Sequence, residues 1–221
     1  MPPILKGVLI VVLSTALGGL AALGINYAAG AVFESPLEPL IAVLIGACVG
    51  FLYGLEAGIL LIYDLDKPAG WLQLVVDLTW SFPNTVFGFV LGNIFYPFFG
   101  SLSRDQSQGK SWIVYAKEGE LHQTLGTINL GGKGQHERMH LLQARLFGPL
   151  YLPLYALFYA VTAVLQVTWT LTVGMALWLF KLRDTPYFRL PKESVVSGFF
   201  GWIYYATPFE LWAYASGNPE D

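Results

Sequence analysis

Long apolar stretches alternate with short polar breaks along most of this chain. Residues 8–33 carry no charged side chain, and residues 40–63 carry a single one, Glu56. A helix needs about 20 apolar residues to cross the hydrocarbon core of a bilayer. Both stretches are therefore predicted to be membrane-spanning helices. A cleaved signal peptide is the less favoured alternative for the first stretch, because the apolar part of such a peptide covers roughly 7–15 residues.

Small residues recur at every fourth position of both predicted spans: Ser14, Gly18, Ala22, Asn26 and Gly30 in the first, and Gly46, Gly50, Gly54 and Gly58 in the second. At this spacing they form a flat stripe that lets two helices approach closely. We expect the stripes to face each other in an antiparallel hairpin. The alternative is a glycine zipper that assembles several chains. Glu56 is either a functional residue or a side chain that reaches to the membrane interface.

A third apolar region, residues 71–99, is interrupted by Ser81-Phe82-Pro83-Asn84, whose proline breaks a helix. We predict an interfacial amphipathic helix from about Ala69 to Trp80 and a more apolar helix from Asn84 to about Tyr96. Asp77 is expected to face the lipid headgroups, with a role beside a functional site as the alternative.

Residues 101–135 form the only long polar stretch. Within it, Trp112–Ala116 and Thr127–Leu130 are predicted strands, because both are short, apolar and rich in β-branched or aromatic residues. Gly131-Gly132-Lys133-Gly134 predicts a loop, and a helix is expected to begin just before His136 and to end at Gly148 and Pro149. The edge of a strand that precedes such a helix can hold an extended substrate by main-chain hydrogen bonds.

The apolar run Leu150–Phe180 is long enough to span a bilayer. Four basic residues follow this run and are expected to face the cytoplasm: Lys181, Arg183, Arg189 and Lys192. Lys6 is expected on the same side if an even number of spans separates it from these residues. A single crossing would put residues 136 and 210 on opposite sides. For these two positions to meet, they lie at mid-depth in the membrane, or Val195–Ala206 re-enters it, or the long run bends back at Gln166 and never fully crosses.

Composition supports a multi-pass membrane protein. Hydrophobic residues make up 55% of the 221 residues and charged residues only 12%, whereas about a quarter of a soluble domain is charged. The net charge of −3 excludes a basic nucleic-acid-binding surface. The single cysteine, Cys48, cannot form an internal disulfide. We expect the lipid bilayer as a partner, and a homo-oligomer if the glycine stripes join chains.

The predicted fold is mainly α, with polytopic membrane helices and a small polar α+β insertion. Residues 1–100 form the membrane helices with the glycine-stripe hairpin, and residues 101–149 form the polar segment and the helix that follows it. Residues 150–221 form the long apolar helix and a C-terminal segment. Length alone favours one compact unit.

Residues 136–140 read His-Glu-Arg-Met-His, which uses two of the three histidines in the chain. Positions four apart share one face of a helix, so His136 and His140 can bind one metal ion. Glu137 lies beside them, where a carboxylate can take a proton from a metal-activated water. Catalytic zinc usually has three protein ligands and one open position.

Two residues are candidates for the third ligand. His122 is the remaining histidine, and Glu210 is a carboxylate among aromatic residues. We prefer Glu210, because a carboxylate buried in an aromatic segment needs a partner. The alternative is that Glu210 points to water near the C-terminus.

The segment His136–Ala144, with Gln143 three residues after the second histidine, resembles the His-Glu-x-x-His-x-x-Gln active helix of many bacterial metallopeptidase-like proteins. Thr207-Pro208-Phe209-Glu210-Leu211-Trp212-Ala213 resembles their second box, which carries the third ligand. This is the gluzincin arrangement of two histidines and a downstream glutamate. The resemblance covers two short segments, and most gluzincins are soluble, whereas this chain is predicted to lie in a membrane.

The resemblance implies an integral-membrane zinc metallopeptidase, located in a bacterial inner membrane, that cleaves a peptide or membrane-protein substrate. Zn²⁺ would be bound by His136, His140 and Glu210, and Glu137 would act as the general base. The candidates for contacts with the substrate or the transition state are His122, Arg145, Tyr204, Tyr205 and Tyr214. Two alternatives remain: a non-enzymatic membrane scaffold assembled through the glycine stripes, and a protein that binds metal for transport or sensing.

Overall fold

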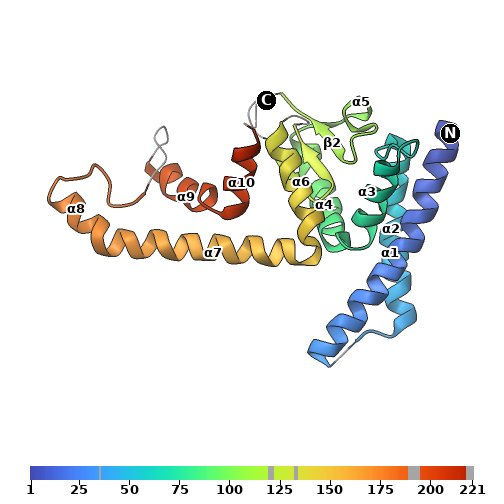
Figure 1. Ribbon diagram of the computed structural model, residues 1–221, viewed down its shortest axis with the longest axis horizontal. Helices are drawn as coiled ribbons and strands as arrows, with labels where there is room; N and C mark the ends of the chain where they lie inside the picture. The colour runs from blue at the N-terminus through green and yellow to red at the C-terminus, as the bar shows by residue number, and fades with distance from the viewer. Residues whose placement is uncertain (35, 119–121, 132–133, 189–194, 218–221) are drawn as a thin grey trace.

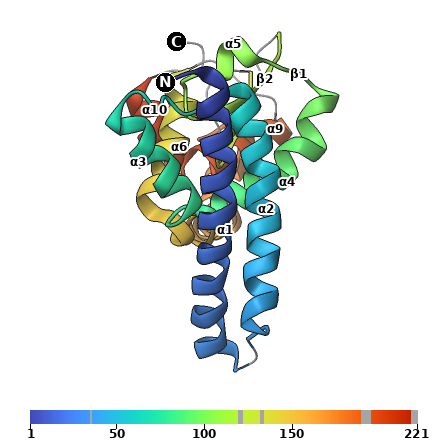
Figure 2. The same cartoon turned by 90° about the vertical axis from the view of Figure 1, so that its right-hand side faces the viewer.

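The computed structural model describes residues 1–34, 36–118, 122–131, 134–188 and 195–217, which fold mainly into helices around one small sheet (Figure 1). Helices α1 (Pro3–Phe33) and α2 (Pro39–Leu60) form an antiparallel hairpin at the N-terminus. Figure 2 shows them side by side, with their connecting turn projecting beyond the other elements. The predicted intramolecular hairpin is therefore confirmed.

The glycine stripes are the contact surface of this hairpin. A Cβ atom on Gly50 would collide with the carbonyl oxygen of Ser14, and one on Gly46 would collide with that of Gly18. At the turn, the side-chain amide of Asn26 donates to the Leu37 carbonyl at 2.9 Å and accepts from the Leu37 N–H at 2.8 Å. The stripes are thus buried within one chain and are used to pack its own helices.

Three helical runs in the described part of the chain are long and apolar enough to cross a membrane: Pro3–Phe33, Pro39–Leu60 and Gln135–Leu179. The predicted break in the third apolar region is also confirmed. Helix α3 (Pro68–Leu78) and helix α4 (Phe82–Phe95) meet at an angle of 82°. Glu56 of α2 accepts a hydrogen bond of 2.8 Å from the side-chain amide of Asn93 in α4, so it is held against a neighbouring helix.

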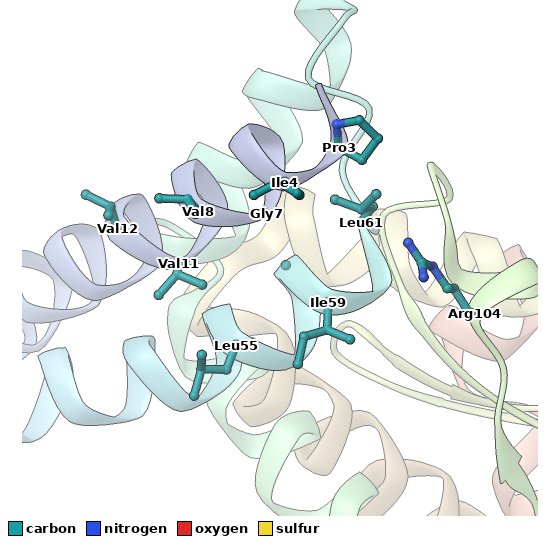
Figure 3. Close-up of a pocket in the computed structure, with 11 residues that line it drawn as sticks. Pro3, Ile4, Gly7, Val8, Val11, Val12, Leu55, Ile59, Leu61 and Arg104 are labelled. Atoms are coloured by element: carbon teal, nitrogen blue, oxygen red, sulfur yellow. The ribbon is translucent and has the colours of Figure 1, made fainter. Parts of the chain in front are cut away.

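A groove of about 470 Å³ lies between α1 and α2 near the N-terminus. Figure 3 shows Val8 and Val11 of α1 and Leu55 and Ile59 of α2 on its walls, with Arg104 of the short helix α5 (Arg104–Ser107) at its edge. The lining is almost entirely apolar. Such a surface fits the lipid-facing side of a membrane helix pair.

The polar segment forms a mixed sheet in the order β1-β2-β4-β3. Strands β2 (Ile113–Ala116) and β4 (Ile128–Leu130) are parallel and correspond to the two predicted strands. The sequence did not indicate β1 (Ser101–Leu102) or β3 (Gln123–Leu125), which are too short to show an alternating pattern. Strand β3 pairs with β4 through a turn at Gly126, whose φ is +54°, and it packs against α4.

Helix α6 (Gln135–Phe147) starts and ends where the sequence predicted. A 3₁₀ segment, η1 (Tyr96–Phe98), follows α4, and another, η2 (Gly148–Leu150), follows α6. The long apolar run forms α7 (Tyr151–Trp169), the π-helical turn η3 (Thr170–Gly174) and α8 (Met175–Leu179). Figure 1 shows α7 lying across the direction of the α1–α2 hairpin. The last two helices are α9 (Val195–Tyr205) and α10 (Pro208–Ser216).

Helix α9 returns along α7. The Thr162 hydroxyl donates to the Ile203 carbonyl at 2.8 Å, and the Gln166 amide donates to the Phe199 carbonyl at 3.4 Å and to the Phe188 carbonyl at 2.6 Å. The expected alternative of a bend at Gln166 is wrong, because α7 continues through this residue and its side chain binds the returning chain. The segment Val195–Ala206 does turn back and pack along α7, and its re-entry into the membrane stays a prediction. Two of the four basic residues expected in the cytoplasm, Arg189 and Lys192, lie outside the described residues.

The hairpin contact can be tested with two glycine substitutions. We expect Gly50→Ala to destabilise the protein by about 1–3 kcal/mol, because the added methyl group overlaps a backbone carbonyl in the partner helix. Gly24→Ala is the matched control, since a Cβ there meets nothing within 4 Å, and alanine favours a helix by up to about 1 kcal/mol. Unfolding in detergent, followed by circular dichroism, measures both. Equal losses of stability in the two variants would contradict the close contact of α1 and α2 at Gly50.

Candidate metal centre

The two histidines of the pentad lie on one face of α6. Gly134, with φ of +98°, immediately precedes this helix, so His136 and His140 occupy its first two turns. Only 3% of His136 and 6% of His140 is exposed. Their Nε2 atoms are 3.1 Å apart. Both nitrogens therefore point at one small volume inside the protein.

Glu210 completes the group from α10. The Thr207 hydroxyl caps this helix by accepting a hydrogen bond of 3.4 Å from the Glu210 N–H, and Pro208 occupies its first turn. Glu210 is fully buried, and its two carboxylate oxygens lie 3.3 Å from His136 Nε2 and 3.3 Å from His140 Nε2. One potential ligand atom from each of the three residues falls within 4.8 Å of the others. The structure thus favours Glu210 over a water-facing position.

His122 is not part of this group in the described residues. It precedes β3 and lies against Gly131, where a Cβ atom would collide with its ring. The preference for Glu210 as the third member agrees with this geometry. A buried group of two histidines and one glutamate could hold a metal ion.

Two further residues orient the potential ligands. Gln143 accepts from His140 Nδ1 at 3.0 Å and donates to the Phe209 carbonyl at 2.8 Å. If Nδ1 carries the proton, Nε2 is left with a free lone pair, which is the form that binds a metal. The Tyr155 hydroxyl donates to Glu210 Oε1 at 2.8 Å. Gln143 belongs to the recognised pattern, but sequence reasoning missed Tyr155, although tyrosines at positions 151, 155 and 159 of an apolar run could have indicated it.

The electrostatics of the centre fit a cation. Burial alone would raise the pKa of Glu210, but its interactions with His136 and His140 outweigh burial and hold the pKa well below its ordinary value. Glu210 Oε2 has no hydrogen-bond partner of good geometry. Burying a carboxylate oxygen without a partner is costly. A metal ion between the three residues would remove that cost.

Glu137 stands next to the group without belonging to it. It is 4% exposed, and its Oε2 atom has no hydrogen-bond partner in the described structure. Together with His140 and Glu210 it lines a pocket of about 700 Å³. A buried carboxylate that faces a pocket beside a metal-binding group is placed to exchange a proton with a molecule in that pocket.

The remaining candidate contacts take different positions. Tyr204 interacts with Glu210 and lines the pocket. The ring of Tyr214 lies 4.3 Å from that of His136, and Tyr205 packs against Tyr214 with ring centroids 5.2 Å apart. Three of the candidates do not line this pocket: Tyr205, Tyr214 and His122. Tyr204 is therefore the candidate that the geometry places nearest to a bound molecule.

Arg145 does not face the pocket. Its guanidinium donates two hydrogen bonds of 2.7 Å to the carboxylate of Asp77, and a third of 3.1 Å to the Ser111 carbonyl. The expectation that Asp77 faces the headgroups is wrong, because Asp77 is fully buried and also accepts from the Tyr63 hydroxyl at 2.8 Å. A charge pair inside the protein requires this dense bonding. Arg145 thus anchors α6 to α3.

A comparison with protein-family models, curated proteins and solved structures finds no match for this chain. The resemblance to gluzincins therefore rests on two short segments alone. The site is therefore interpreted from its own geometry.

Metal binding can be measured directly. We expect about one divalent metal ion per chain in the detergent-purified protein, and loss of most of it in His136→Ala, His140→Ala and Glu210→Gln, since each change removes one of three ligands. His122→Ala is the control and should keep the metal. Elemental analysis of the four variants and the wild type gives the answer. Metal retained in Glu210→Gln but lost in His122→Ala would move the third ligand to His122.

The anchor of α6 gives a second test. We expect Arg145→Met to destabilise the protein by about 3–5 kcal/mol, because it leaves the Asp77 carboxylate buried without a partner. The double change Asp77→Leu with Arg145→Met should recover much of that loss, since both charges are then gone. Lys6→Met breaks the exposed pair with Asp66 and should leave stability nearly unchanged. Denaturant unfolding compares the three proteins, and a double variant less stable than Arg145→Met would contradict the account.

Proposed function

We propose that this protein is a membrane-embedded, zinc-dependent peptidase that hydrolyses peptide bonds at or within the membrane interface. One observation carries the proposal: His140 and Glu210 of the buried His136–His140–Glu210 group line a largely apolar pocket together with Glu137, whose Oε2 has no hydrogen-bond partner. Two imidazoles and a carboxylate are a ligand set typical of catalytic zinc, which keeps one position open for chemistry.

The residues of the chain have separate roles in this proposal. Zinc held by the three ligands would supply Lewis acidity to a water molecule and to the scissile carbonyl. Glu137 accepts the proton of the attacking water and delivers a proton to the leaving amine, so that the C–N bond is replaced by a carboxylate and an amine. Gln143 and Tyr155 hold His140 and Glu210 in place. Tyr204, which lines the pocket, would donate a hydrogen bond to the developing oxyanion.

The helices around the pocket support the membrane setting. Its walls come partly from α4 and α7, and α7 belongs to a run long and apolar enough to cross a bilayer. Charged ligands inside such a region need protein and water around them. The buried, hydrogen-bonded group supplies the protein part of that environment, and the pocket supplies room for water.

The glycine stripes favour the peptidase over a scaffold. A scaffold assembled through these stripes needs them on the surface, whereas Gly18, Gly46 and Gly50 are buried in the hairpin of a single chain. A protein that binds metal for transport or sensing uses the same three ligands but has no need for Glu137. This residue therefore separates the two metal-dependent functions.

The test replaces the proposed base. We expect Glu137→Gln to keep its zinc and to lower peptide hydrolysis by about 100-fold or more, because the amide cannot accept the proton. Asp105→Asn, an exposed carboxylate-to-amide change in α5, is the matched control and should retain full activity. Hydrolysis of a peptide and membrane-protein library is measured on samples of known zinc content. Wild-type rates in zinc-loaded Glu137→Gln would overturn the peptidase and favour transport or sensing.

A further inference from the structure

The pocket beside the metal group extends along α7. Leu152, Ala156 and Ala160 line it at intervals of four residues, so they form one row on the helix. A second row consists of Tyr151, Tyr155 and Tyr159. Ala160 is five residues beyond Tyr155, the residue that bonds Glu210, which corresponds to about 7–8 Å along the helix axis. The pocket therefore continues well past the potential ligands.

The chemical character of the pocket lining changes along α7. The acidic and imidazole groups, Glu137, His140 and Glu210, lie toward the Tyr151–Tyr155 part of the α7 wall. Beyond them, the α7 wall is aliphatic or aromatic, and Phe87 of α4 is also part of the lining. Two of the α7 residues are alanines, whose small side chains leave space where larger ones would fill it. A bound molecule would thus have a polar reacting group at one end and an apolar part at the other.

A strand borders the same pocket. Gln123, Thr124 and Leu125 of β3 line it, and β3 is the last strand in the order of the described sheet. An edge strand offers main-chain donors and acceptors to an extended chain. Alternate side chains of such a chain point to opposite sides. This border favours a peptide over a molecule without a backbone.

We infer that the pocket selects peptides with large apolar side chains next to the scissile bond, and that Ala156 and Ala160 provide the space for them. The inference rests on the proposed peptidase function and names the substrate class of that site. In an apolar pocket, one methylene group changes the specificity constant by about 10-fold or more. Replacing a central Leu-Phe pair by Ser-Ser should therefore reduce cleavage by at least about 100-fold.

Binding is measured apart from cleavage. The zinc-loaded Glu137→Gln protein in lipid nanodiscs is titrated with two fluorescently labelled, blocked peptides of equal length, one with Leu-Phe at its centre and one with Ser-Ser. We expect the Leu-Phe peptide to bind at least about 10-fold more tightly. Equal affinities would overturn the inference. Because this measurement does not require turnover, it also stands if the peptidase proposal fails.

Substitutions in α7 test whether Ala156 and Ala160 are responsible for the preference for the Leu-Phe peptide. Ala156→Trp, added to Glu137→Gln, should abolish the preference for Leu-Phe, whereas Val161→Trp is the matched control. Val161 lies on the same helix, is 47% exposed and does not line the pocket. Retained zinc shows that each variant is folded, and Ala160→Trp replaces Ala156→Trp if that protein loses its zinc. A preference that survives a folded Ala156→Trp or Ala160→Trp variant would overturn the inference.

Three further outcomes separate the proposals. Wild-type protein that binds the Leu-Phe peptide tightly but cleaves neither peptide would refute the peptidase and leave the apolar selectivity standing. A fluorescent fatty acid that binds more tightly than either peptide, and is excluded by the tryptophan variant, would assign the pocket to an acyl chain and overturn the inference. Cleavage of both peptides at equal rates would support the peptidase and reject the apolar selection.

Discussion

The buried ion pair between Asp77 and Arg145 holds the helix on which the candidate site depends. A charged pair in the interior is stable only when its remaining donors and acceptors are also satisfied, and here Tyr63 and the Ser111 carbonyl supply those bonds. The C-terminal end of α6 is fixed as well, because Asn84 donates to the Gly148 carbonyl at 2.7 Å and Ser81 donates to the Ala144 carbonyl at 3.0 Å. The His136–His140 face is thereby presented to α10 in one orientation.

The third member of the group reaches the histidines because the chain turns back on itself. Polar side chains inside a long apolar helix need partners, and Thr162 and Gln166 of α7 find them on the carbonyls of α9 and of the segment before it. This pairing brings α10 beside α6, where Gln143 binds the Phe209 carbonyl next to Glu210. The hydroxyl and amide groups of α7 thus position the candidate metal-binding group.

Residue patterns within one element were readable from the sequence, and contacts between distant elements were not. The spacing of glycines predicted the hairpin, Pro83 predicted the break between α3 and α4, and the pentad predicted two histidines on one face of a helix. The partner of Arg145 lies 68 positions away, and nothing in the neighbourhood of Asp77 distinguishes it from an aspartate at the membrane surface. Tyr155 was missed for the same reason, since its bond to Glu210 joins residues 55 positions apart. Strands of two or three residues, such as β1 and β3, are too short to show the alternation of apolar and polar residues that identifies a strand.

The sequence by itself determined which helices are apolar, where they end, and which side chains could bind a metal, because these depend on local composition and on a fixed helical period. It left open whether the long apolar run crosses once, bends or is followed by a returning segment, and so whether His136 and Glu210 meet. Only the tertiary structure decided that these two residues meet, because their meeting depends on which distant backbone carbonyls satisfy Gln166 and Thr162 and on which carboxylate neutralises Arg145. Those pairings are set by the packing of the whole chain, in which buried polar groups must find partners.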